Sequence, residues 1–254
     1  MFFKFYNIPD FDIANKIIGQ NPTIKFASAF NLNDPYELKF NLKIDPESPK
    51  QRDDFFKYNP EKTEKDFLEW KKRITPNFIW YTEQEQRNGL AQTITLSSFT
   101  YSNKNNLMWS HYTNNHTGIC VEYSKEMIEF LTRHENFFAS DNVAYSKNPP
   151  VVDNTEDISI KIKKMMFNKQ LEWKYENEFR IVLRSDENTD FIPIDRNFIK
   201  RVYIGSKCNL STEIVELCKK LQTPVSYAIT IGDSYDVKFS EYKENSSTMR
   251  AFWG

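Results

Sequence analysis

The stretch "WKYENEFRIVL", from Trp173 to Leu183, has the alternating polar and apolar residues of a β-strand. Because alternate side chains of a strand share a face, Glu176, Glu178 and Arg180 would form one charged row, with about 6 to 7 Å between neighbours. Apolar and aromatic residues flank this row, which is typical of a central strand. A half-buried row of charges costs stability unless the charges are paired or used. The row therefore predicts a functional site, with a solvated ladder of ion pairs as the alternative.

Strands dominate the rest of the chain, helices are interspersed, and no internal repeat occurs. Alternating hydrophobicity predicts further strands at residues 2–6, 23–28, 93–99, 117–123, 142–146, 198–205, 224–231 and 235–242. Helical periodicity and capping residues predict helices at residues 10–19, 105–112, 124–134, 157–169 and 211–221. We therefore expect an α+β fold with mainly antiparallel or mixed sheets and flanking helices.

The segment at about residues 46–90 has a different character. It is rich in charge, contains no valine and reads as helices interrupted at Pro60 and Pro76. We expect a single domain over residues 1–254, with this segment as a charged helical insertion packed on one side of the sheet. A role as a lid or as a partner-binding surface stays open.

Composition narrows the class of protein. With 34 basic and 35 acidic residues the net charge is −1, which gives no global electrostatic case for nucleic-acid binding. The three cysteines contain no C-x-x-C pair, which suits a reducing compartment and argues against a thiolate zinc site. The first ten residues become polar too soon for a signal peptide, and no apolar run approaches the roughly 20 residues of a membrane span. We expect a cytoplasmic protein that does not bind membranes.

The stretch "NLMWSHYTNNHTGICVEY" holds two of the three histidines, His111 and His116. A spacing of five does not place two ligands on one helical face, and no cysteine or spaced carboxylate completes a metal set. We expect no metal. The stretch is either a well-packed structural corner or a wall of a substrate site. In the second case Trp109 or Tyr112 would stack on the substrate and His111 would donate a hydrogen bond.

The stretch "FASAFNLNDPYE" is dense in turn-forming residues. The proline that follows Asp34 forces this residue into an extended conformation. The segment is either a structural turn or a loop that places Ser28, Asn33, Asp34 or Glu37 at the mouth of a cleft.

Taken together, the three stretches resemble the signature blocks of a bacterial family catalogued as domain of unknown function 2971. The family pattern is F-N-D-P-x-E, then F-S followed by M-W-x-H-Y-x-x-x-H-x-G, then W-x-x-E-x-E-x-R. The first block has one extra residue here, so Asn31 or Asn33 could fill its asparagine position. The resemblance covers most of the chain outside the insertion and the tail, but the family name implies no activity.

A weaker resemblance is to the ADP-ribosyltransferases, in the order of strand, helix, strand and a late strand that begins at a catalytic glutamate. It implies that Glu178 is the catalytic carboxylate and Glu176 its upstream partner. It also implies that Ser28 supports the nicotinamide pocket and that Lys4 stands where a histidine or arginine binds NAD. Arg180 would hold the diphosphate or orient Glu178.

The resemblance implies an NAD-consuming enzyme, either an ADP-ribosyltransferase or an NAD glycohydrolase, acting as a bacterial toxin or anti-phage effector. NAD would be the substrate, with an unknown protein or nucleic-acid acceptor and an antitoxin or defence-system partner. One alternative is a non-catalytic ligand-sensing or protein-interaction domain. Another is a metal-independent nuclease that uses His111 with Glu176 and Glu178.

Overall fold

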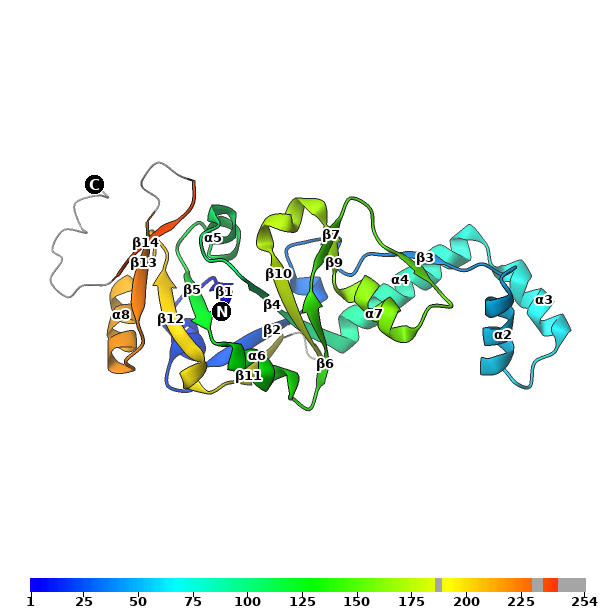
Figure 1. Ribbon diagram of the computed structural model, residues 1–254, viewed down its shortest axis with the longest axis horizontal. Coiled ribbons are helices and arrows are strands. Elements are labelled where there is room, and N and C mark those ends of the chain that lie inside the picture. Colours follow the sequence, from blue (N-terminus) through cyan, green and yellow to red (C-terminus); the bar gives the residue numbers. More distant parts are fainter. Residues whose placement is uncertain (186–188, 230–234, 242–254) are drawn as a thin grey trace.

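The computed structural model describes residues 1–185, 189–229 and 235–241 of the chain. Its centre is a ten-stranded sheet in which, over the described residues, every pairing is antiparallel except that of β12 with β13. This confirms the predicted α+β class (Figure 1). The strands of this sheet are β1 (Phe2–Tyr6), β2 (Thr23–Ser28), β4 (Ile94–Thr100), β5 (Ile119–Tyr123), β6 (Phe137–Asn142), β10 (Glu178–Arg184), β11 (Thr189–Pro193), β12 (Ile199–Ile204), β13 (Val225–Ile229) and β14 (Lys238–Glu241).

Strand β4 is the branching point of this sheet. Along one edge it pairs with β10 over its whole length, from Ile94 to Thr100. The other edge is shared, because β2 pairs with it at Thr95 and Leu96 and β1 pairs with it at Thr100. Strands β1 and β2 therefore diverge and leave a fork along this edge, in which Ser98 lies.

Helices cover the sheet and bury their apolar faces on it. They are α1 (Phe11–Ile18), α5 (Asn106–Tyr112), α6 (Lys125–Thr132), α7 (Ile158–Met166) and α8 (Ser211–Lys220), with short 3₁₀ helices η1 (Ala29–Asn31), η2 (Leu171–Glu176) and η3 (Arg196–Phe198). Asp10 caps α1 by accepting a hydrogen bond from the Ile13 amide, and Ile17 and Ile18 enter the main core. Two small parallel pairs complete the fold: β3 (Asn41–Lys43) with β8 (Val151–Asp153), and β7 (Ala144–Ser146) with β9 (Asn168–Gln170).

The segment predicted as an insertion forms α2 (Pro49–Tyr58), α3 (Glu64–Arg73) and α4 (Pro76–Thr93). Its helix α4 packs partly on the sheet, because Ile79 and Leu90 join a core cluster that contains Leu96 of β4 and Val182 of β10. Helix α4 leads away from the strands, and α2 and α3 form the far end of an elongated molecule (Figure 1). We call α2 and α3 the arm.

Aromatic rings give the arm a small core of its own. Phe67 is buried, stacks on Trp70 at 5.6 Å between ring centroids, and contacts Phe55 and Phe56. A capping box between Thr63 and Asp66 starts α3. This local core explains why the arm needs no contact with the sheet.

Several elements differ from the sequence prediction. Strands β3, β6, β8, β9 and β11 are short or weakly alternating and were missed, and the predicted helix at 157–169 ends at Met166 because β9 follows it. The predicted strands at 224–231 and 235–242 match β13 and β14, and their residues 230, 231 and 242 lie outside the described residues. In the part of the chain that the structure describes, no helix is long and apolar enough to cross a membrane.

Phe67→Ala should unfold the arm without unfolding the sheet. Loss of a buried phenylalanine costs about 3–5 kcal/mol, and besides Phe67 only Gln51 is buried in α2 and α3. Limited trypsin digestion followed by mass spectrometry should then show fast cleavage at the lysines of α2 and α3. Leu68→Ala, at the exposed neighbouring position, is the control and should leave cleavage unchanged. Slow cleavage in both variants would show that the arm is held by other contacts.

Candidate functional site

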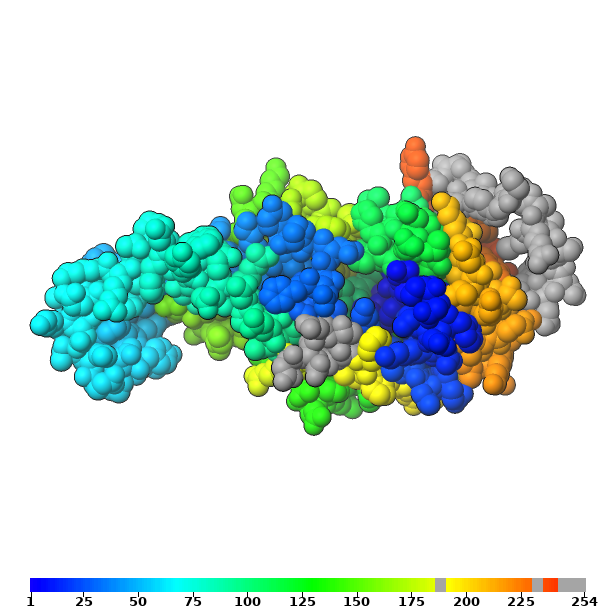
Figure 2. Space-filling view, turned by 180° about the vertical axis from the view of Figure 1, so that it is seen from behind, coloured from blue at the N-terminus to red at the C-terminus, as the bar shows by residue number. Residues whose placement is uncertain are grey.

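A cavity of about 440 Å³ opens at the fork of the sheet, which is a volume typical of small-molecule sites. Strands β1, β2 and β4 form its inner walls, and residues 31–33 and α5 stand at its rim. Figure 2 shows this side of the molecule, with the dark-blue N-terminal segment, the lighter blue segment that follows β2 and the green α5 around a recess. The charged residues that line the cavity are Lys4, Lys25, Glu37, Lys169, Glu176, Glu178 and Arg180.

The fully buried guanidinium of Arg180 organises one wall. Its Nε and one terminal nitrogen donate to the two carboxylate oxygens of Glu178, at 2.7 and 3.2 Å. The other terminal nitrogen donates to Glu37 Oε1 at 2.6 Å and to the carbonyl of Met166 at 2.7 Å. A planar, permanently charged fork is suited to two carboxylates at once, which a lysine could not hold in this way.

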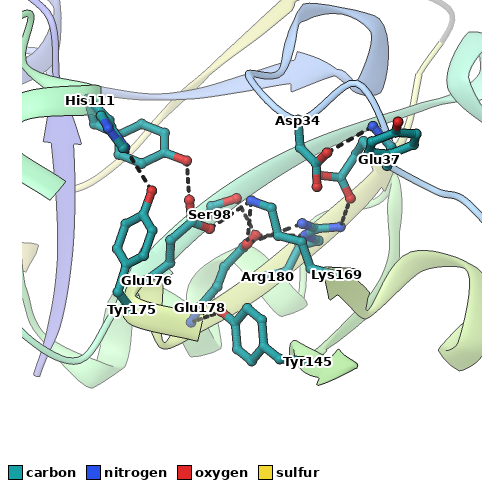
Figure 3. Close-up of polar contacts among 12 residues, drawn as sticks. Asp34, Glu37, Ser98, His111, Tyr145, Lys169, Tyr175, Glu176, Glu178 and Arg180 are labelled. Atoms are coloured by element: carbon teal, nitrogen blue, oxygen red, sulfur yellow. Dashed lines mark hydrogen bonds and ion pairs between the residues drawn. The ribbon is translucent and has the colours of Figure 1, made fainter. Parts of the chain in front are cut away.

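A second cation, Lys169 from β9, bridges two carboxylates. Its Nζ lies 2.7 Å from Glu176 Oε2 and 3.5 Å from Glu178 Oε2. Glu176 also accepts a hydrogen bond from the Tyr112 hydroxyl on α5. The result is a continuous chain of polar contacts from Glu37 to Tyr112 across the cavity wall (Figure 3).

The prediction that Glu176, Glu178 and Arg180 share the face of one strand is wrong for Glu176. Strand β10 begins at Glu178, whereas Glu176 ends the 3₁₀ helix η2. Between them Asn177 has a positive φ of 44°, a left-handed conformation that asparagine tolerates better than most residues. The two glutamates reach the same cavity by a turn in the backbone, and strand alternation does not explain it.

The pKa values of the two neighbouring carboxyl groups, Glu176 and Glu178, are shifted in opposite directions. Burial is the main reason that the pKa of Glu176 is raised from 4.5 to about 7; the Glu178 charge adds to this, and Lys169 opposes it. Burial also raises the pKa of Glu178, but Arg180 and Lys169 outweigh burial and hold that pKa well below its usual value. Near neutral pH the site therefore contains one permanent carboxylate and one carboxyl group poised to exchange a proton.

Lys4 enters the fork from β1. Its Nζ donates to the carbonyl of Ser98 at 3.1 Å and lies 5.7 and 5.3 Å from the ring centroids of Tyr6 and Phe99. The hydroxyl of Ser98 in turn donates to Glu178. Burial lowers the pKa of Lys4 to about 7, against the opposing charge of Glu178.

The loop before the insertion leaves two buried carboxylate oxygens unpaired. Glu37 Oε2 and Asp34 Oδ2 have no hydrogen-bond partner among the described residues. Asp34 Oδ1 accepts from the Tyr36 amide at 2.8 Å, so the predicted turn role of this side chain is present. Glu37 lines the cavity, and its free oxygen is therefore an acceptor available to a ligand.

Of the residues predicted for the site, the structure brings seven to the cavity: Lys4, Asn33, Glu37, Tyr112, Glu176, Glu178 and Arg180. Ser28 and Asp34 do not line it. The Ser28 hydroxyl donates to the carbonyl of Ala91 at 2.9 Å, so it faces away from the cavity and cannot support a ligand there.

Trp109 cannot stack on a ligand as predicted, because it is fully buried in a second core with Phe5. Its indole donates to the carbonyl of Asn103 at 2.7 Å. His116 stacks on Trp109 and contacts Asn106 through Nε2 at 3.0 Å. These contacts are those of a structural corner.

His111 lies outside the cavity. Its exposed ring contacts the Tyr175 hydroxyl through Nδ1 at 2.7 Å and meets Trp173 edge to face. It touches neither glutamate, so a catalytic role would have to act from a distance (Figure 3). Among the described residues, no group of three or more histidine, cysteine, aspartate or glutamate side chains could hold a metal ion.

No motif or periodicity marks Lys169 or Ser98, which complete the polar wall. Lys169 stood at the end of a predicted helix and Ser98 in an ordinary alternating strand. Only the pairing of β4 with β10, opposite Arg180, brings Ser98 to the glutamates.

Arg180→Met should destabilise the fold strongly, because it leaves Glu178 and Glu37 buried without their counter-charge. The expected loss is about 3–5 kcal/mol of unfolding free energy, measured by urea denaturation at neutral pH. Arg184→Met, at the exposed end of the same strand, is the matched control and should change the value by about 0.5 kcal/mol or less. Equal losses in the two variants would contradict a stabilising role for the buried guanidinium.

Glu176→Gln should change how stability depends on pH. Between pH 4.5 and about 7, folded Glu176 keeps a proton that the unfolded chain has released, so the unfolding free energy of the native protein falls as pH rises through this window. The glutamine variant lacks this term. The advantage of the native protein over the variant should therefore shrink by an amount on the order of 3 kcal/mol. Urea titrations across the window test this, with exposed Glu172→Gln as control; a constant difference would refute the raised pKa.

Comparison with known proteins adds a family match. Residues 108–181 match the model of a family described as "Protein of unknown function (DUF2971)", which confirms the expected resemblance over this span. No curated protein and no solved structure matched the chain. The span runs from the α5 wall of the cavity to the middle of β10, and thus includes both Glu176 and Glu178. Over this segment the chain is therefore similar to the DUF2971 family.

Proposed function

We propose that this chain cleaves the bond between nicotinamide and ribose in NAD, as an ADP-ribosyltransferase or an NAD glycohydrolase. The observation that supports it best is the pair Glu176 and Glu178, which share one ammonium group, line one ligand-sized cavity and have opposite protonation tendencies. Two neighbouring carboxyl groups in different protonation states are typical of enzymes that cleave glycosidic bonds.

Glu178 would stabilise the transition state. Departure of nicotinamide builds positive charge on the ribose, and a fixed carboxylate favours that state over the ground state. Arg180 and Lys169 keep Glu178 ionised. Its Oε2 is the less tightly held oxygen, with contacts at 3.2 and 3.5 Å, so this oxygen is the better placed to face a ribose hydroxyl or the charged sugar.

Glu176 would act as the general base. With a pKa of about 7 it can take a proton from the attacking water or acceptor at neutral pH. The hydroxyl of Tyr112 and the ammonium of Lys169 fix its orientation. Both partners donate to its carboxylate, so they would also stabilise the ionised form that must precede proton transfer.

The apolar lining suits the nicotinamide ring. Phe3 and Tyr112 line the cavity and are only partly buried, and aromatic faces stack on flat rings. The order β1, α1, β2 and the late β10 is the order on which the likeness to ADP-ribosyltransferases rests. Transfer to a protein or nucleic acid, in a bacterial toxin or anti-phage setting with an antitoxin or defence-system partner, belongs to the same proposal.

A specific observation also favours the alternative of a non-catalytic ligand-binding domain. Each oxygen of Glu178 already contacts Arg180, and Arg180 makes four hydrogen bonds, so this part of the wall would be stable without a substrate. The nuclease alternative draws no support from the geometry, because His111 does not line the cavity.

Incubation of the purified protein with NAD, alone and with bacterial lysate, should release nicotinamide, measurable by chromatography. Glu178→Gln should reduce the rate at least about 100-fold, since a carboxylate that meets developing charge is worth several kcal/mol. Glu176→Gln should reduce it less at neutral pH and remove the dependence on a group with a pKa of about 7.

Glu122→Gln is the matched control, because Glu122 on β5 bonds Tyr203 outside the cavity. Full activity in Glu178→Gln would reject its role. No nicotinamide from either mixture, with no thermal shift on adding NAD, would reject NAD cleavage and favour the ligand-binding alternative.

A further inference from the structure

Lys4 is partly buried and differs from the two buried cations of the cavity. Lys169 and Arg180 each contact two carboxylates. Among the described residues, Lys4 contacts no carboxylate at ion-pair distance, and its one hydrogen bond is to the Ser98 carbonyl. An ammonium group has three N–H donors, so the charged form would be poorly satisfied here.

The surroundings of Lys4 favour a neutral amine. The rings of Tyr6 and Phe99 lie 5.7 and 5.3 Å from its Nζ and limit its contact with water, and the side chain is only partly exposed in the fork of the sheet. Burial lowers its pKa to about 7, the attraction of Glu178 opposes this, and the nearby charge of Lys25 adds to it. A neutral amine has a free lone pair, and desolvation is one of the ways in which proteins make lysine a nucleophile. The titratable groups that line the cavity with Lys4 are Tyr6, Lys25, Glu37, Tyr112, Lys169, Glu176, Glu178 and Arg180.

The same cavity offers acceptors for hydroxyl groups. Glu37 Oε2 is buried and unpaired among the described residues, and Glu178 Oε2 has only long contacts. A buried acceptor without a donor costs stability, which a ligand hydroxyl would recover. An amine that attacks carbonyl carbon, beside carboxylates that accept from hydroxyls, fits a compound that carries both groups.

We propose that Lys4 is an amine nucleophile that condenses with the aldehyde of a hydroxyaldehyde, such as the open-chain form of a reducing sugar. The Nζ lone pair attacks the carbonyl carbon and the C=O π bond breaks, which gives a carbinolamine after proton transfer from nitrogen to oxygen. Loss of the hydroxyl group with one further nitrogen proton forms the C=N bond. Amine and aldehyde thus give imine and water, with no change in total oxidation state. This reaction does not depend on NAD cleavage.

Reductive trapping tests the proposal. The full chain is incubated with D-glyceraldehyde and sodium cyanoborohydride, which delivers hydride to the imine carbon and leaves a stable secondary amine. Tandem mass spectrometry then locates the adducts, since the α-amino group of Met1 is a competing nucleophile on the same peptide. We expect Lys4 to be labelled at least about 10-fold faster than the other lysines at pH 7, because an ordinary lysine of pKa near 10.4 is almost fully protonated there. The rate should rise through pH 7.

Controls separate reactivity from accessibility. Lys125→Met removes an exposed lysine of α6 that does not line the cavity and should leave the Lys4 adduct in place, whereas Lys4→Met should remove it. The ratio of Lys4 to other lysines in the native protein, compared with the protein in urea, needs no variant and should collapse on unfolding. Labelling of Lys4 no faster than of exposed lysines would overturn the proposal. Equal selectivity with propionaldehyde, which lacks hydroxyl groups, would overturn the choice of a sugar.

Discussion

The buried guanidinium of Arg180 is the interaction on which the rest of the site depends. It lies between Glu178, its neighbour on β10, and Glu37, which is 143 positions earlier in the chain. Without it the cavity would contain three buried glutamates and one paired lysine. By holding Glu178 ionised and Glu37 in place, it lets the protein keep concentrated negative charge in its interior at a cost that the fold can bear.

The fork beside β4, where β1 and β2 separate, both creates the cavity and positions Lys4. A sheet that simply continued from β4 would satisfy the Ser98 carbonyl with a neighbouring strand. Here β1 and β2 separate, and the side chain of Lys4 takes the place of that missing neighbour. The same separation creates the cavity, so one irregularity in strand pairing accounts both for the space and for the unusual position of the amine.

The sequence predicts the α+β class and about half of the site residues, and there is a physical reason why the other site residues could not be predicted. Polar and apolar residues alternate along strands such as β2 and β10, so periodicity predicts them. The edge strand β6 is only partly buried along its length, so no face is marked. For the site, motif residues such as Glu178 and Tyr112 stand out by their type. Lys169 does not, because only the packing of β9 on the sheet brings its ammonium to the glutamates. Trp109 was wrongly predicted to contact a ligand, because a large aromatic residue beside histidines is equally typical of a ligand-binding wall and of a buried core.

The turn at Asn177 has a consequence for how the site can move. Glu178 is fixed by the hydrogen-bonded ladder of β10 with β4, whereas Glu176 belongs to the 3₁₀ helix η2, which connects β9 to β10 and is not itself part of a strand pairing. Rotation about the Asn177 backbone would therefore alter the separation of the two carboxylates without breaking any strand pairing. The two glutamates of the E-x-E motif are thus held in different ways. Glu178 is held by the backbone pairing of the sheet, and Glu176 is held by the side chains of Lys169 and Tyr112.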